Sequence, residues 1–167
     1  MGMSIFVIEC IIICVIFTVI IVTMAKKGDP IDIVFDYPQP IIDRAYELGL
    51  INQDGKTLRK SVIIKKCIAV AIIGIPLGFL ARYVNHAETF WQGFRVIYGI
   101  GIVVSAYDFL ILDCLWFCHD KSLIIPGTED LVDSYHDYMF HFKASLRGLL
   151  FTLPAAIVAG LVTAMIA

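Results

Sequence analysis

Carboxylate and imidazole side chains, which bind metals and transfer protons, gather in the stretch 114–142 between two apolar segments. This stretch holds three of the four histidines and five acidic residues. Asp133, Asp137 and His141 follow one another at steps of four, so on a helix they would share one face. Two carboxylates and an imidazole suit Zn, Mn or Fe, and also Mg where water completes the coordination shell. The spacing predicts a divalent metal site here.

One helix rarely closes a metal site, so a second element must contribute ligands. The end of the preceding apolar segment offers His119, Asp120 and Asp113. We predict Asp113 as a further metal ligand. We predict His119, Asp120 and His136 as general acids or bases. The alternative is the solvated face of an amphipathic helix, because the spacing matches neither HExxH nor paired CxxC. Both interpretations stay open at this point.

Basic residues follow the acidic ones on the same predicted helix. Lys143 and Arg147 come seven and eleven residues after His136, which puts the three on one strip of a helix. A histidine above a lysine and an arginine near the headgroup plane could bind lipid phosphates. The alternative is that both basic side chains only extend their charges from an apolar helix into water.

The composition indicates a membrane protein. Of 167 residues, 59% are hydrophobic and 17% are charged, and apolar runs reach about 20 residues, which spans a ~30 Å hydrocarbon core as helix. We predict an all-α integral membrane protein that forms a single membrane domain over residues 1–167. Its first apolar run is followed by lysines, whereas a signal peptide carries them before its core, so we expect an anchor. The four spans are predicted at about 5–24, 67–84, 94–117 and 148–167.

The distribution of lysine and arginine predicts the orientation. Eight basic residues lie between the first two spans, only Arg82 and Arg95 between the next two, and three in the last connector. The positive-inside rule therefore places connectors 25–66 and 118–147 in the cytoplasm and both termini outside the cell membrane, which the chain crosses several times. The eight residues are Lys26, Lys27, Arg44, Lys56, Arg59, Lys60, Lys65 and Lys66.

Both cytoplasmic connectors are predicted to carry a short amphipathic helix. Three prolines exclude a continuous helix at the start of the first connector, and Pro40 is well placed to open a helix over 40–51 that has an apolar stripe. In the second connector, Thr128 is a good N-cap and is followed by two acids that the helix dipole favours. That helix is predicted to run through 129–147, and its continuation into the fourth span is left open.

Acidic residues inside the spans are the other functional signal. A carboxylate at the centre of a spanning helix costs about 2.5–3.5 kcal/mol, so it is protonated, paired or set in a polar cavity. Gly101 and Ser105 form a small-residue pair that lets two helices approach closely, and Asp108 follows on the same face. Asp113 lies about 140° around an α-helix from Asp108, so the two are not expected to pair. Glu9 is close enough to the outer end to reach the headgroups.

Three classes of function fit these patterns. We narrowly favour a metal-dependent or acid/base enzyme that acts on a lipid or amphiphilic substrate at the cytoplasmic membrane interface. The alternative is a small transporter or channel subunit for a cation, metal or proton that uses Asp108 and Asp113. The third is a non-catalytic subunit that docks a partner through exposed aromatic side chains such as Tyr135. The bilayer is the expected partner, and a homo-oligomer or larger membrane complex would bury the polar groups of the spans. A net charge of -2 gives no signal for nucleic acid.

Overall fold

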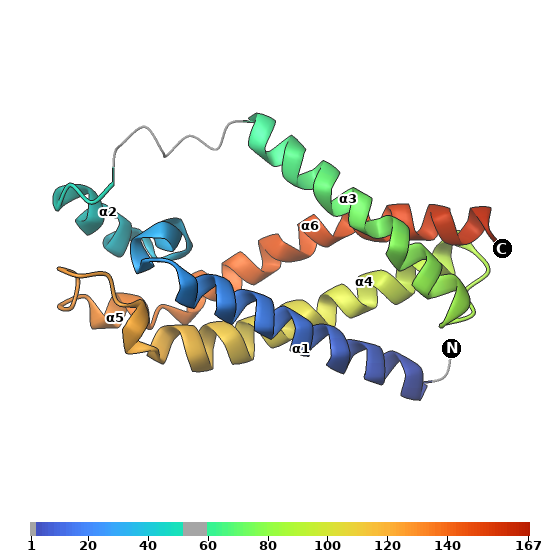
Figure 1. The fold of residues 1–167 in the computed structure, drawn as a ribbon, viewed down its shortest axis with the longest axis horizontal. Helices are drawn as coiled ribbons and strands as arrows, with labels where there is room; N and C mark the ends of the chain where they lie inside the picture. Colours follow the sequence, from blue (N-terminus) through green and yellow to red (C-terminus); the bar gives the residue numbers. More distant parts are fainter. Residues whose placement is uncertain (1–2, 52–59) are drawn as a thin grey trace. The chain divides into compact units, whose positions relative to one another are not determined.

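The structure, a computed structural model, describes residues 3–51 and 60–167, and this part of the chain is helical without a strand. Four helical stretches are long and apolar enough to cross a membrane (Figure 1). This confirms the predicted all-α class and is compatible with a multi-pass membrane protein. Lys56 and Arg59, counted above for the orientation, lie outside the described residues. The four stretches are Ser4–Lys27, Ile64–Tyr83, Phe90–His119 and Val132–Met165.

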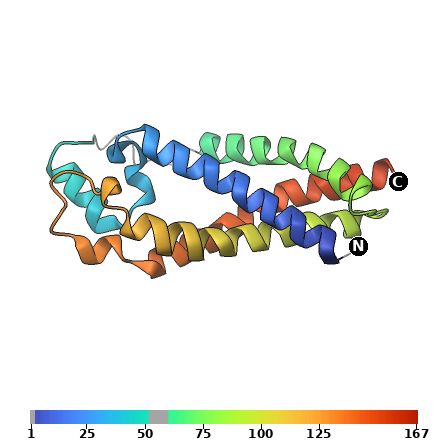
Figure 2. The same cartoon turned by 60° about the horizontal axis from the view of Figure 1, so that its bottom comes forward.

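The long helices coincide with the apolar runs, and α2 begins next to Pro40. Figures 1 and 2 show that α4 continues without interruption into a π-helical segment, η3. The third stretch runs from Phe90 to His119 and is therefore longer at both ends than the predicted span 94–117. The bounds are α1 Met3–Lys27, η1 Pro30–Asp36, α2 Gln39–Glu47, α3 Lys60–Tyr83, α4 Phe90–Tyr107, η3 Asp108–Trp116, η4 Phe117–His119, η5 Lys121–Leu123, α5 Val132–Tyr135 and α6 Tyr138–Met165.

The chain forms two compact units. Unit 1 comprises Met1–Cys14, Leu58–Ala106 and Ser145–Ala167, and unit 2 comprises Val15–Thr57 and Tyr107–Ala144. Each unit therefore draws on segments that are distant in the sequence, and each has its own cluster of buried apolar side chains.

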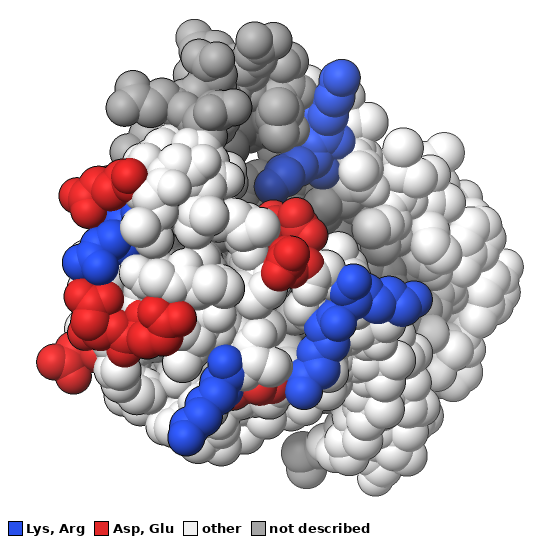
Figure 3. Space-filling view, turned by 60° about the vertical axis from the view of Figure 1, so that its left-hand side comes forward, with Lys and Arg blue, Asp and Glu red and all other residues white. Residues whose placement is uncertain are grey.

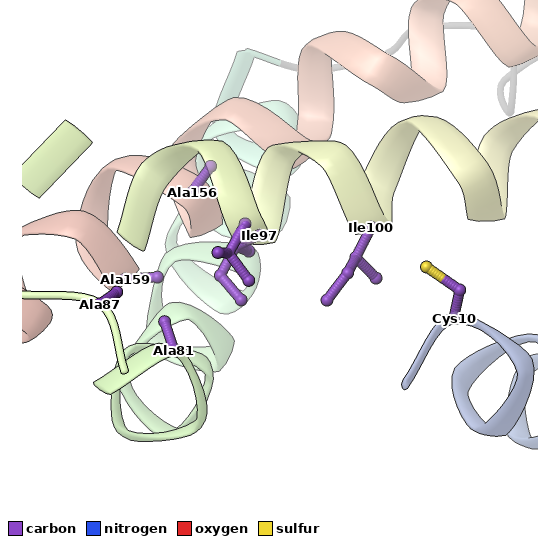
Figure 4. Close-up of a cluster of buried hydrophobic side chains, with 8 residues drawn as sticks. Cys10, Ala81, Ala87, Ile97, Ile100, Ala156 and Ala159 are labelled. Carbon is purple, nitrogen blue, oxygen red and sulfur yellow. The ribbon is translucent and has the colours of Figure 1, made fainter. Parts of the chain in front are cut away.

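Four of the eight buried core residues of unit 1 are alanines. Figure 4 shows Ala81 and Ala87 close to Ala159, with Ile97 beside them and Ile100 between Ile97 and Cys10. Small residues let helix backbones approach closely, which is the main way that helices associate where lipid removes the hydrophobic driving force. The buried members are Cys10, Ala81, Ala87, Val96, Ile97, Ile100, Ala156 and Ala159.

The helix contact predicted for Gly101 and Ser105 is present in unit 1. A methyl group added at Gly101 would lie 3.1 Å from Thr152 on α6. The Ser105 hydroxyl is 2.9 Å from the Ser145 hydroxyl and also donates to the Ser145 carbonyl at 3.1 Å. The small-residue pair therefore brings α4 and α6 together, as its spacing predicts.

The core of unit 2 surrounds Tyr37. This ring is fully buried, and its hydroxyl donates to the Leu123 carbonyl at 2.6 Å. Burial raises the pKa of Tyr37, so the hydroxyl remains a hydrogen-bond donor. Tyr135 lies beside it with ring centroids 5.5 Å apart and is only 6% exposed, so the expectation of an exposed docking aromatic was wrong at this position.

The amphipathic helix predicted for the first connector is confirmed as α2. It starts one residue before Pro40, and the proline sits in the first turn where its missing N–H costs nothing. The helix buries Ile41, Ile42 and Ala45 against the core of unit 2. Its apolar stripe therefore packs on protein.

The helix predicted over 129–147 is broken, and this corrects the expectation of a single acidic stripe. Thr128 does not cap it: its buried hydroxyl donates to the Ile125 carbonyl at 2.7 Å and is 2.6 Å from the Tyr135 hydroxyl. These bonds hold residues 125–131 in turns, so α5 starts only at Val132. The helix then stops after Tyr135, and α6 begins at Tyr138.

Candidate functional site

The residues predicted to bind a metal are separated by the broken helix. Asp133 is exposed on α5, whereas His141 is buried on α6. Asp137 stands between the two helices and accepts the backbone N–H of Phe140 at 3.0 Å, which is the geometry of an N-cap. Residues 3–51 and 60–167 contain no group of three or more His, Cys, Asp or Glu that could hold a metal ion.

Two of the predicted ligands nevertheless meet. The Asp113 carboxylate lies 3.5 Å from Nδ1 of His141, an ion pair if the imidazole is protonated. The side chains differ in burial, since His141 is 4% exposed and Asp113 is 22% exposed. A carboxylate at this nitrogen orients the imidazole ring. Asp113 and His141 therefore form an acid–base pair within two of the spanning stretches.

The other ring nitrogen of His141 has no partner. Nε2 is buried, and no hydrogen bond from it is found anywhere in the described part of the chain. The ring is packed edge-on against Phe117 and Phe140, with centroids 5.5 and 5.3 Å away. A buried polar atom without a hydrogen bond costs about 1–3 kcal/mol. An unsatisfied imidazole nitrogen of this kind is a place for a proton, a water molecule or a substrate group.

The π-helical segment explains why Asp108 joins this pair. Its backbone bonds from i to i+5, so residues five apart come closer to one face than they do in an α-helix. Asp108 lies within electrostatic range of both Asp113 and His141. The angle of about 140° expected between the two acids assumed α-helical geometry, which does not hold in η3. That they do not pair stays a prediction.

Two hydroxyl groups pair between α1 and the end of α4. Tyr107 directly precedes Asp108, and its hydroxyl is 2.8 Å from that of Thr18 on α1. This pair is partly buried within unit 2. It supplies hydrogen-bonding groups in the spans beyond the three that ionise.

Asp120, predicted as an acid or base, is held in a structural network instead. Its carboxylate accepts the Ser122 hydroxyl at 2.6 Å and the Trp116 indole N–H at 3.0 Å, and it pairs with Lys26 at 3.1 Å. The Ser122 hydroxyl, the Ser122 backbone N–H and Lys26 together lower the pKa of Asp120 from 3.8 to about 2, against a smaller opposing effect of burial. A carboxylate this stable as an anion is a poor general base at neutral pH.

A pH-dependent stability difference follows from the lowered pKa of Asp120. The folded pKa lies below the unfolded one, so the stabilisation is fully present above about pH 4 and is lost as the pH falls toward 2. Asp120→Asn is therefore expected to lower the thermal midpoint of the detergent-solubilised protein at pH 7, with a difference from wild type that shrinks below pH 4. A difference that is constant from pH 7 to pH 3 would contradict the assignment. Asp133→Asn, at an exposed site, is the control.

His119, at the start of the second connector, lies close to His136 in the same connector. Their ring centroids are 5.0 Å apart, and Tyr138 is 6.5 Å from His136. His119 is exposed and His136 is half-buried, so this pair is open to water. The structure thus brings these two histidines close together. Their catalytic role stays a prediction.

The basic residues predicted to bind headgroups lie on α6. Lys143 and Arg147 are both exposed there. Because α6 begins at Tyr138, they belong to the last spanning stretch and not to a separate connector helix. Their contact with lipid phosphates stays a prediction.

The remaining acids of the connector have structural partners. Arg44 donates to both oxygens of Asp130, at 3.1 and 3.2 Å. The Gly127 N–H donates to Glu129, whose pKa is lowered by backbone N–H groups, its own and that of Gly127. Figure 3 shows acidic and basic side chains gathered side by side on the face that it draws. These charges stabilise turns and do not mark a catalytic centre.

One buried polar pair was not anticipated. The sequence suggests that Glu9 reaches the headgroups, but it is only 8% exposed, and both carboxylate oxygens lie 2.9 Å from Nδ2 of Asn85. Asn85 follows α3, far from Glu9 in the sequence. No local pattern connects the two residues, and only the packing of α1 in unit 1 brings them together.

Comparisons of the chain with protein-family models, with curated proteins and with solved structures found no match.

Proposed function

We propose that this protein binds and conducts protons within its spanning helices, with His141 and Asp113 as the exchanging pair. The observation that carries the proposal is the 3.5 Å contact between Asp113 and Nδ1 of a buried His141 whose Nε2 has no partner among the described residues. Ionisable groups inside spans are costly, and Asp/Glu/His chains are a usual means of proton transfer in membrane proteins. An imidazole can hold a proton on either ring nitrogen, which suits a reversible carrier.

Neighbouring groups support a route to and from this pair. Asp137 is exposed one helical turn before His141, where it can exchange protons with water. Asp108 comes five residues before Asp113 and lies within electrostatic range of Asp113 and His141. Tyr107 and Thr18 then add hydroxyls that can relay a proton. The sequence left both a metal and a proton as candidates. A metal site needs converging ligands, and no group of three lies together in the described residues, whereas a proton relay does not need such a group.

Proton uptake into liposomes tests the proposal. The purified protein is reconstituted with a pH-sensitive dye inside, and a potassium gradient with valinomycin drives inward proton movement. We expect acidification well above that of empty liposomes, and a roughly tenfold or greater loss in His141→Gln and in Asp113→Asn. His119→Gln, which changes an exposed histidine, is the matched control and should retain the flux. Wild-type flux equal to that of empty liposomes, or full flux in folded His141→Gln protein, would refute proton conduction.

An acid–base enzyme for an amphiphilic substrate is the second candidate, favoured by the aromatic rings around the pair. Phe117 and Phe140 give His141 an apolar wall, while Asp113 holds the ring as the acid does in a catalytic His–Asp pair. Incubation with a total lipid extract, followed by mass spectrometry, would reveal a lipid consumed by wild-type protein and not by His141→Gln. An unchanged extract together with proton flux favours the carrier.

A further inference from the structure

A small cavity in unit 1 is lined by both apolar and polar side chains. Its volume is about 300 Å³, the lower end of the range for small-ligand sites. The apolar lining includes Ala87 and Val96, both members of the buried core (Ala87 is labelled in Figure 4). The remaining lining residues are polar, namely Asn85, His86, Gln92 and Arg95. The cavity lies where the chain passes from α3 to α4.

Asn85 leaves one half of its amide unsatisfied at this cavity. The residue is 3% exposed, and its Nδ2 is occupied by the Glu9 carboxylate. Its Oδ1 is buried, and within residues 3–51 and 60–167 it accepts no hydrogen bond. Because buried acceptors are nearly always satisfied, a bound N–H or O–H group is the expected partner.

Arg95 gives the cavity a positive charge. Its Nε donates to the Trp91 carbonyl at 3.0 Å, which fixes the side chain along α4 while the other N–H groups of the guanidinium project from the same planar group. Arg82 is engaged differently, since its guanidinium donates to the Ala87 and Ile166 carbonyls and lies 3.7 Å from Glu88. Arg95 is therefore the cation that can bind an anionic group such as phosphate in a bidentate manner.

The backbone and the surroundings also favour a ligand here. His86 has a φ of 54°, a left-handed conformation that strains the backbone of a non-glycine residue and that is often found at ligand sites. The neighbouring Trp91 is 64% exposed, as is usual for a tryptophan at the headgroup level of a bilayer. The cavity falls between the stretches Ile64–Tyr83 and Phe90–His119, where a chain that crosses the membrane turns at its surface.

We infer that this cavity binds a phosphate group that carries a nearby N–H donor, as in phosphoethanolamine, with Arg95 on the phosphate and Asn85 Oδ1 accepting from the ammonium group. The same chemistry is available from the headgroup of phosphatidylethanolamine and from free phosphoethanolamine in water. Phosphatidylcholine presents the same phosphate and a similar charge but has no N–H. A site with an unsatisfied acceptor should therefore reject choline, because the acceptor would stay unpaired.

The test compares these headgroups on the full-length protein. Native mass spectrometry of detergent-solubilised wild type, titrated with short-chain phosphatidylethanolamine or phosphatidylcholine, should show about tenfold tighter binding of the ethanolamine lipid. Arg95→Gln should lose most of that binding. Lys121→Gln removes an exposed basic side chain of unit 2, to which no headgroup contact is assigned, and should leave the binding unchanged. Equal binding of both lipids by wild type, or equal losses in the two variants, would overturn the inference and indicate general attraction between cations and phosphate.

A second arm separates the sources of the headgroup. Free phosphoethanolamine is titrated calorimetrically into wild type and Arg95→Gln in phospholipid-free detergent. Heat that depends on Arg95 shows that the headgroup alone suffices, so a soluble ligand is competent. Lipid binding without such heat shows that the acyl chains contribute and that the membrane is the source. Absence of selective binding in both arms refutes the site, and this outcome does not bear on proton flux through His141.

Discussion

Tyr37→Ala is expected to lower the free energy of unfolding of unit 2 by about 3–5 kcal/mol, the range found when a large aromatic side chain is removed from a core. The ring is fully buried and packs on Phe117 and Tyr135, at 5.0 and 5.5 Å between centroids. Its loss also leaves the Leu123 carbonyl without the hydroxyl that it accepts at 2.6 Å. The cavity and the unpaired acceptor act in the same direction, since both penalise only the folded state.

Hydrogen exchange measured by mass spectrometry can localise this effect. Peptides covering 30–51 and 121–137 should exchange much faster in Tyr37→Ala, because they form the core around the missing ring. Phe35→Ala is the matched control: this ring is 50% exposed two residues earlier and should change stability by at most about 0.5 kcal/mol. Tyr37→Phe separates the hydroxyl from the ring and should cost only about 1 kcal/mol. Unchanged exchange in Tyr37→Ala would mean that this core does not hold unit 2 together.

Gly74→Val is expected to destabilise unit 1 by about 3 kcal/mol, at the upper end of the overpacking range. A Cβ at Gly74 would lie 2.5 Å from the Ala155 carbonyl oxygen on α6 and 2.8 Å from Cβ of Val158. The first of these atoms belongs to the backbone, so relief requires α3 and α6 to move apart. Such a movement loses the close contact that small residues provide along both helices.

Gly148 on α6 provides a matched control for Gly74. Gly148→Val introduces the same side chain at a glycine whose Cβ would meet nothing within 4 Å, so it should leave stability nearly unchanged. Unfolding in mixed micelles with increasing dodecyl sulfate, followed by tryptophan fluorescence, would compare the two variants. A loss in Gly148→Val equal to that in Gly74→Val would show that valine itself, and not the α3–α6 contact, is responsible.

The four long apolar helices could be predicted because their signal is local. Apolar runs of sufficient length have few alternatives in a membrane, and the prolines before α2 restrict the backbone at known positions. The contact at Gly101 and Ser105 could also be predicted, since it depends only on spacing along one helix. These features require no knowledge of which helix packs on which.

The candidate site could be predicted only in part, because it depends on contacts that no spacing encodes. Asp113 and His141 were both identified as chemically active, but their pairing needs α6 beside the third spanning stretch. The break before Tyr138 was missed because residues 129–147 carry an uninterrupted helical pattern, while the Tyr135 and Thr128 hydroxyls stabilise turns instead. Asn85 gave no signal at all, since an asparagine after a helix usually marks only a turn.

The π-helical stretch Asp108–Trp116 also changes how positions along this span should be compared with one another. A helical wheel drawn from Phe90 assigns faces correctly up to Tyr107, but beyond that point each turn takes up more residues and the wheel falls out of phase. Labelling experiments that scan this span with single cysteines should therefore assign faces separately for Phe90–Tyr107 and for Asp108–Trp116. Alignments of distant sequences face the same difficulty, because a gap of one residue here would be a change of winding and not a lost part of the protein.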